Sequence, residues 1–137
     1  MWSEPQTISG TIFGTAGPGV WSIPLAAQSL QFYKDVRIVG IQSSLIVTGP
    51  NPQAVDAVAE CYINIPPDKN QNFGSFGGVV YGWAVRAGSD ISHIVEIDIP
   101  ANYAVNVQGI AYLFAVAGAP FTALSYIDFV YKIKSFM

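Results

Sequence analysis

The chain has 137 residues, which suits one domain with its own core and leaves little room for two. Charged residues make up only 11% of the chain, against about 25% in an average soluble domain, while hydrophobic residues make up 51%. Six basic residues within a net charge of −3 cannot neutralise many phosphates, so nucleic acid is a poor candidate partner.

The sequence shows no membrane-spanning or secretory segment. Its most apolar stretch, residues 109–121, is about thirteen residues long and contains a Gly-Ala-Pro break, whereas a membrane helix needs about twenty residues. The N-terminus has neither a basic start nor an apolar stretch behind it, so we expect synthesis in the cytoplasm without a secretory signal. The lone Cys61 excludes an internal disulfide.

Alternation of apolar and polar residues predicts strands along most of the chain. In chain order, the predicted strands cover residues 7–13, 36–48, 55–65, 79–86, 91–99, 103–116 and 127–134. A helix is an alternative for the first half of 55–65, because Asn51 and Pro52 form a fair helix cap. Single glycines at Gly40 and Gly109 predict a bulge or bend within two long strands.

Seven or eight strands without a long helix predict an all-β fold, in which two antiparallel sheets pack as a sandwich. Connections of unequal length, above all residues 66–78, favour crossovers between the sheets and therefore a single jelly roll of about eight strands. An immunoglobulin-like sandwich is second, since the paired cysteines around a tryptophan are missing. Residues 1–19 are expected to form an N-terminal arm or loosely packed leading segment, and residues 20–137 the sandwich domain.

The residues that most often carry catalysis are sparse. His93 is the only histidine, and alternation places it on the apolar side of its strand, away from Glu96 and Asp98. Cys61 also lies on an apolar face, where a free thiol packs as a small hydrophobe. Because no nucleophile is paired with a base, we expect that the protein is not an enzyme.

Metal and cofactor sites are not expected either. One histidine and one cysteine give too few soft ligands for a structural zinc site, and no EF-hand spacing is present. Two pairs of carboxylates, Asp56 with Glu60 and Glu96 with Asp98, have a spacing at which a glycosidase could use them. The solvent-exposed face of an ordinary strand has the same spacing.

The scarcity of charge predicts a surface that is covered by other molecules. Six basic and nine acidic side chains on roughly 6,900 Å² of folded surface give about one charge per 460 Å², which approaches the largest apolar patch of an ordinary monomer. Aromatic residues exceed what one small core can hold, and aromatic residues with depleted charge are typical of an interface core. The candidate interface residues are Trp2, Trp21, Phe73, Phe76 and Phe136.

Other interpretations of these aromatic residues stay open. Both termini can fold back on their own domain, and Phe73 and Phe76 can close the end of the sandwich. The stretch around them, NQNFGSFGG, lacks the Lys-Ser/Thr of a phosphate loop, and its amides and aromatic rings suit a contact loop instead. A carbohydrate-binding module is the alternative function, and its candidate residues are Trp83, Tyr81, Asn70, Asn72 and Asp90.

The last third of the chain resembles a known class of protein. The stretch HIVEIDIPANYAVNVQGIAYLFAV, followed by YIDFVYKIK, is similar to the closing strands of small jelly-roll proteins of virus particles, such as bacteriophage minor capsid, decoration and fibre proteins. The resemblance implies a non-enzymatic structural protein of the virion that is made in the host cytoplasm. It also implies a homo-oligomer, with a trimer favoured, that contacts other capsid or virion proteins.

Overall fold

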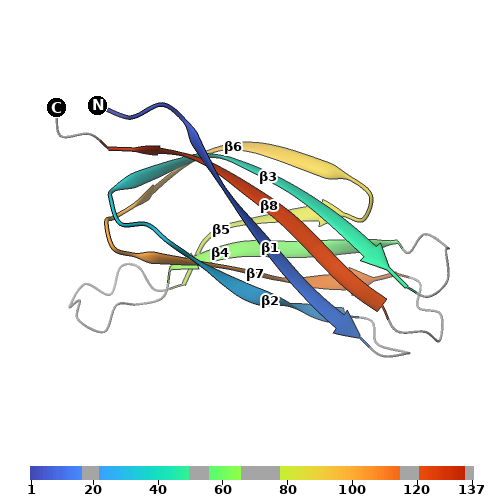
Figure 1. Ribbon diagram of the computed structural model, residues 1–137. Helices are drawn as coiled ribbons and strands as arrows, with labels where there is room; N and C mark the ends of the chain where they lie inside the picture. The colour runs from blue at the N-terminus through green and yellow to red at the C-terminus, as the bar shows by residue number, and fades with distance from the viewer. Residues whose placement is uncertain (17–21, 50–55, 66–77, 115–120, 135–137) are drawn as a thin grey trace.

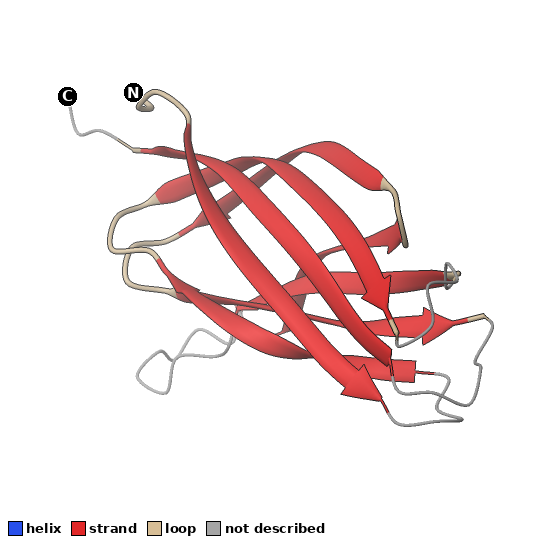
Figure 2. Cartoon of the chain, turned by 45° about the vertical axis from the view of Figure 1, so that its right-hand side comes forward, coloured by secondary structure: helices blue, strands red, loops and turns tan. Residues whose placement is uncertain are grey.

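The computed structural model describes residues 1–16, 22–49, 56–65, 78–114 and 121–134, and every regular element in these ranges is a strand (Figures 1 and 2). The eight strands are β1 (Gln6–Ala16), β2 (Ser22–Gln31), β3 (Val36–Thr48), β4 (Ala57–Ile65), β5 (Gly78–Arg86), β6 (Asp90–Ile99), β7 (Ala104–Leu113) and β8 (Phe121–Ile133). The predicted all-β class is confirmed, and the helix considered for the start of residues 55–65 is not present in the described part, which is strand β4. The described residues contain no helix that could span a membrane.

The strands form two four-stranded antiparallel sheets, ordered β1-β8-β3-β6 and β2-β7-β4-β5 (Figure 1). The first strand pairs with the last, the second with the seventh, the third with the sixth and the fourth with the fifth. The chain is thus one long hairpin whose successive strand pairs alternate between the two sheets. This winding is the jelly roll, so the predicted topology is confirmed over the immunoglobulin-like alternative.

Strand β1 lies within the segment that the sequence assigns to an arm. Its register with β8 runs without interruption from Gln6 opposite Tyr131 to Ala16 opposite Phe121. Residues 6–16 are therefore part of the sandwich and not loosely packed, because eleven consecutive residue pairs bind them to a central strand. The domain boundary at residue 19 stays a prediction, since residues 17–21 lie outside the described part of the chain.

Strand β2 is the strand that sequence analysis misses. Its Pro24 argues against a central strand, and a register shift between Leu25 and Gln28 interrupts the alternation. Both features fit the place of β2 at the edge of its sheet, where a missing N–H and a bulge are tolerated.

The core lies between the two sheets, and the part of it that the structure describes is apolar except for two serines. The largest fully buried side chains are Phe129, Ile12, Ile23, Ile38, Ile41, Leu45, Ile63, Ile99, Ile127, Val85 and Val105. Ser43 and Ser125 are buried among them, 3.4 Å apart between their hydroxyl oxygens, and Ser125 Oγ donates to the carbonyl oxygen of Ser44 at 2.9 Å. The buried hydroxyl of Ser125 is therefore satisfied.

Glycines mark where backbones deviate or approach closely. The bulge predicted at Gly40 is confirmed by register shifts between Ile38 and Gly40 towards both neighbouring strands. At Gly109 the pairing with β4 is regular, and a Cβ there would lie 2.7 Å from the carbonyl oxygen of Glu60. At Gly14, a Cβ would clash with the carbonyl oxygen of Pro24, so the backbones of edge strands β1 and β2 lie close together.

Candidate functional site

The outer face of the sheet β2-β7-β4-β5 carries apolar side chains on three neighbouring strands, β2, β7 and β4. Alternate residues of β4 and β7, such as Ala59 and Ala111, are buried, so the residues between them point away from the core. Pairing of the strands then brings apolar side chains together: Tyr112 lies opposite Val58, and Ile110 opposite Pro24. We call this surface the apolar face and define it by Pro24, Val58, Tyr62, Ile110 and Tyr112.

Two charged side chains belong to the described part of this outer face. Glu60 lies opposite Ile110, and Arg86 lies at the β5 edge opposite Val58. Arg86 Nη2 contacts Asp56 Oδ2 at 2.7 Å, and this hydrogen-bonded pair lowers the pKa of Asp56 and raises that of Arg86. Since Arg86 is paired with a carboxylate, Glu60 is the one charge on this face without an ion pair among the described residues.

Two aromatic side chains at or beside the apolar face are exposed to solvent. Tyr112 is 39% exposed, and Phe114, just beyond the end of β7, is 58% exposed. Side chains of this size usually supply buried area at interfaces. In one isolated copy the apolar face would be in contact with water.

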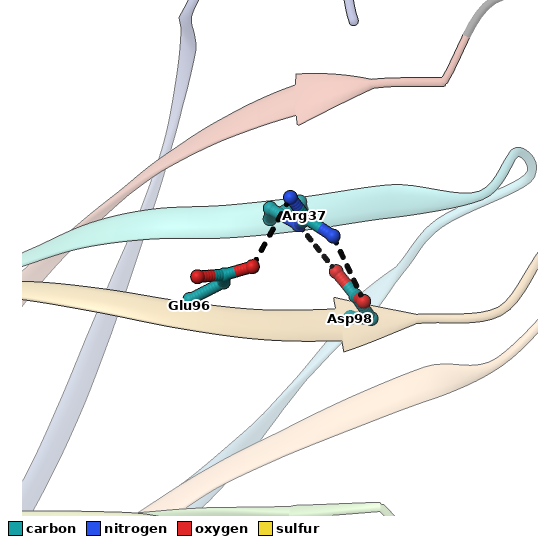
Figure 3. A network of polar contacts seen from close by, with 3 residues as sticks. All are labelled: Arg37, Glu96 and Asp98. Carbon is teal, nitrogen blue, oxygen red and sulfur yellow. Dashed lines mark hydrogen bonds and ion pairs between the residues drawn. The ribbon is translucent and has the colours of Figure 1, made fainter.

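The other sheet, β1-β8-β3-β6, carries charged and polar side chains on its outer face together with exposed apolar ones, of which Ile94 on β6 is 97% exposed. Arg37 on β3 contacts two carboxylates of β6: its Nη1 lies 3.1 Å from Glu96 Oε1, and its Nε donates to Asp98 Oδ1 at 2.7 Å (Figure 3). The guanidinium also lies 4.5 Å from the ring centroid of Trp2. The hydrogen bond from Arg37 holds the pKa of Asp98 below its usual range, and the same bond raises the pKa of Arg37.

A shallow groove of about 440 Å³ opens on the same outer face, away from Arg37. We define the groove by the outward side chains that line it, which are Gln42, Ser44, Asp90, Ser92, Tyr126 and Asp128. They stand in two rows across the sheet, because Ser44 pairs with both Tyr126 and Asp90, and Gln42 with both Asp128 and Ser92. Ser44 is the short central residue of one row and Ser92 the short end residue of the other, and the Tyr126 ring, 47% exposed, lies beside Ser44.

A small apolar row borders the groove. Leu124 on β8 pairs with Phe13 on β1 and with Ile46 on β3, and the latter two are 55% and 45% exposed. Sequence reasoning missed this row and the apolar face because these side chains lie next to apolar residues in the sequence, so alternation does not mark them as pointing outward. Only the pairing of distant strands brings them together.

The three carbohydrate candidates within the described ranges, Trp83, Tyr81 and Asp90, do not gather at one surface. Trp83 is 6% exposed and packs edge-on against Phe129 at 6.2 Å between ring centroids, so it presents no ring face to a sugar. Tyr81 is half-buried, and its hydroxyl lies 2.8 Å from His93 Nδ1. Asp90 is exposed in the groove on the other sheet. The expected platform of Trp83 and Tyr81 is therefore corrected: alternation along β5 turns both rings inward, towards the core.

The predicted interface residues fall into two groups. Trp2 is half-buried against its own chain, bridged to Lys134, and Ser3 N donates to the carbonyl oxygen of Ile133 at 2.8 Å. The N-terminus thus folds back beside the end of β8 (Figure 1), and an interfacial role for Trp2 stays a prediction. The remaining candidates lie outside the described residues: Trp21, Phe73, Phe76 and Phe136, together with the carbohydrate candidates Asn70 and Asn72.

Within the described ranges, no group of three or more His, Cys, Asp or Glu side chains could hold a metal ion. Cys61 is buried, as its place in the alternation predicted, and burial raises its thiol pKa to about 11. The thiol is therefore protonated at neutral pH, and a protonated, enclosed thiol is a poor nucleophile.

No protein-family model and no curated protein sequence matches this chain. Among solved structures, the chain is similar to the VP2 subviral particle of infectious bursal disease virus, with 12% identity, a TM-score of 0.39, and coverage of 96% of this chain and 38% of the other. It is also similar to a chain of broad bean stain virus, with 6% identity, a TM-score of 0.40, and coverage of 94% and 87%. A CBM4 chain has 14% identity, a TM-score of 0.38, and coverage of 90% and 72%. The chain spans about two fifths of the length of the infectious bursal disease virus chains that it matches.

Proposed function

We propose that the protein is a non-enzymatic structural component of a virus particle that associates with further copies of itself through the apolar face. The observation that carries the proposal is the outer surface of the sheet β2-β7-β4-β5, where Pro24, Ile110 with Tyr112, and Val58 lie on three neighbouring paired strands. The jelly roll is a fold that viral capsid proteins use, and it presents flat sheet faces to neighbours. The virion location and the threefold symmetry follow the sequence resemblance.

The physical argument for association rests on the hydrophobic effect. Burying apolar surface is favourable by about 25 cal/mol per Å², and the low charge of the apolar face leaves few groups whose desolvation would oppose contact. Glu60 is the exception, and it stands opposite Ile110 where a partner's polar group can reach it. A non-enzymatic role is supported by the burial of Cys61 and by the contact of His93 with Tyr81.

The test is the mass of the native protein, measured by light scattering during gel filtration. We expect the unmodified chain to have a multiple of its 14.7 kDa monomer mass, and Ile110→Asp or Tyr112→Asp to shift the protein to the monomer. Both side chains point away from the core, so the fold should survive, as circular dichroism would verify.

A matched control is Phe13→Asp, which places the same charge on an exposed ring of the opposite sheet. We expect this variant to keep the mass of the unmodified protein. A monomeric unmodified chain would contradict the proposal, and so would a mass that Ile110→Asp and Tyr112→Asp leave unchanged.

A further inference from the structure

We propose that the groove on the sheet β1-β8-β3-β6 binds a small neutral saccharide. The inference is independent of the proposed assembly, because the groove and the apolar face lie on opposite sheets. It also uses a different ring from those that sequence analysis selects, namely Tyr126.

The size and shape of the groove set the class of ligand. Ligand pockets usually enclose about 300–1,000 Å³, so a groove of about 440 Å³ has room for a small saccharide and little more. The floor consists of the strand backbone around Ser44 and Ser92, whose side chains are short. Such a floor leaves the tips of the surrounding side chains within reach of a ligand.

The lining combines an aromatic ring with hydrogen-bond donors and hydrogen-bond acceptors. The exposed Tyr126 ring offers an apolar face against which the C–H face of a pyranose can stack. Gln42 supplies two amide donors and one acceptor, and the Asp90 and Asp128 carboxylates accept from sugar hydroxyls. Sugar hydroxyls donate and accept, so this mixture matches a polyol better than a purely apolar ligand.

One of the acceptors is already oriented. Ser9 Oγ on β1 donates to Asp128 Oδ1 at 2.5 Å, which restrains the carboxylate. Ser9 and Asp128 are direct register partners, so the restraint comes from the strand pairing. A restrained acceptor loses less side-chain entropy when a ligand binds.

Charge decides between neutral and anionic ligands. The groove has two carboxylates in its lining and no basic side chain. The nearest basic side chains on this face are Arg37 and Lys132, which pair with each other nearer the other end of the sheet. Arg37 is already bonded to Glu96 and Asp98. Phosphorylated or sialylated sugars would therefore be repelled, whereas neutral hexoses and N-acetylhexosamines would not.

The experiment is a glycan array followed by calorimetric titration of the full chain with the neutral mono- or disaccharide that gives the strongest array signal. We expect saturable binding of neutral glycans and loss of the signal when the same glycan carries a sialic acid. Tyr126→Ala and Gln42→Ala should each weaken binding about tenfold or more, since a lost stacking contact or hydrogen bond is worth about one power of ten in affinity.

Two further variants separate recognition from folding. Asp90→Asn keeps the shape of the groove and removes one acceptor charge, so it should weaken binding with an unchanged unfolding temperature. Phe13→Ala, an exposed ring on the same outer face that does not line the groove, should bind like the unmodified protein.

The proposal is overturned if no neutral glycan binds saturably, if sialylated glycans bind better, or if Tyr126→Ala binds as tightly as the unmodified chain. These results would leave the native mass unaffected, so failure of sugar binding and failure of assembly can be told apart.

Discussion

Single side chains on the polar sheet show how this protein uses its few charges. Arg37 contacts Glu96 and Asp98 (Figure 3) and also lies over the Trp2 ring, so one cation holds two strands and the N-terminal segment together. The sequence places Glu96 and Asp98 correctly on the outer side of their strand. It cannot show Arg37 between them, because that contact depends on the pairing of β3 with β6.

Replacement of Arg37 by Met should raise the pKa of Asp98 towards the usual carboxyl value. In the unmodified protein the lowered pKa means that the pairing stabilises the fold above the ordinary carboxyl pKa, and that this stabilisation is lost as the pH falls through the lowered value. The effect on stability should be small, since the Asp98 side chain is 64% exposed. Titration followed by carboxyl carbon NMR measures the pKa directly.

The matched control for this titration is Arg86→Met, which removes the partner of Asp56 on the other sheet. It should raise the pKa of Asp56 and leave that of Asp98 unchanged. An Asp98 titration that is the same with and without Arg37 would show that the pairing does not exist in solution.

At the scale of elements, alternation locates seven of the eight strands because most have one face towards the core and one towards water. Strand β2 escapes this pattern, since Pro24 and the bulge after Leu25 interrupt it. Strand β3 is predicted with its bounds and with its bulge, because Gly40 is the one glycine in a run rich in β-branched residues. The place of β2 at a sheet edge is the physical reason that it can hold this irregularity, since an edge strand tolerates a missing N–H and a bulge.

The contact between edge strands β1 and β2 gives a prediction of its own. Gly14→Ala would bring a methyl group against the Pro24 carbonyl oxygen and the Ile23 side chain, so one strand must move. We expect a loss of about 1–3 kcal/mol in the free energy of unfolding, in the range of overpacked sites, measured by urea denaturation.

Gly82→Ala is the control, because a Cβ there lies at ordinary contact distance, 3.5 Å from the Cys61 carbonyl oxygen. Its stability should match or slightly exceed that of the unmodified protein, since alanine restricts the unfolded chain more than glycine. Equal stability of Gly14→Ala and Gly82→Ala would mean that the two sheet edges are farther apart than described.

At the scale of the whole molecule, the sequence predicts the class of fold and the presence of an interface with other molecules. It does not predict which surface forms that interface. Low charge and many aromatic residues indicate an interface, yet the aromatic residues selected from the sequence are mostly near the termini or in the segment 66–77. The apolar face joins Pro24, Val58 and Tyr112, which are far apart in the chain. It exists only because β2, β7 and β4 are neighbours in one sheet.

The most direct test of the account is hydroxyl-radical footprinting of the native protein, with the oxidation rate of each ring measured by mass spectrometry. Tyr33, which is 76% exposed and lies outside the apolar face, serves as the internal reference for Tyr112 and Phe114. The account predicts that Tyr112 and Phe114 are strongly protected in the native species and become reactive when Ile110→Asp separates the copies. Oxidation of Tyr112 and Phe114 in the native species at the rates of the separated chain would contradict it.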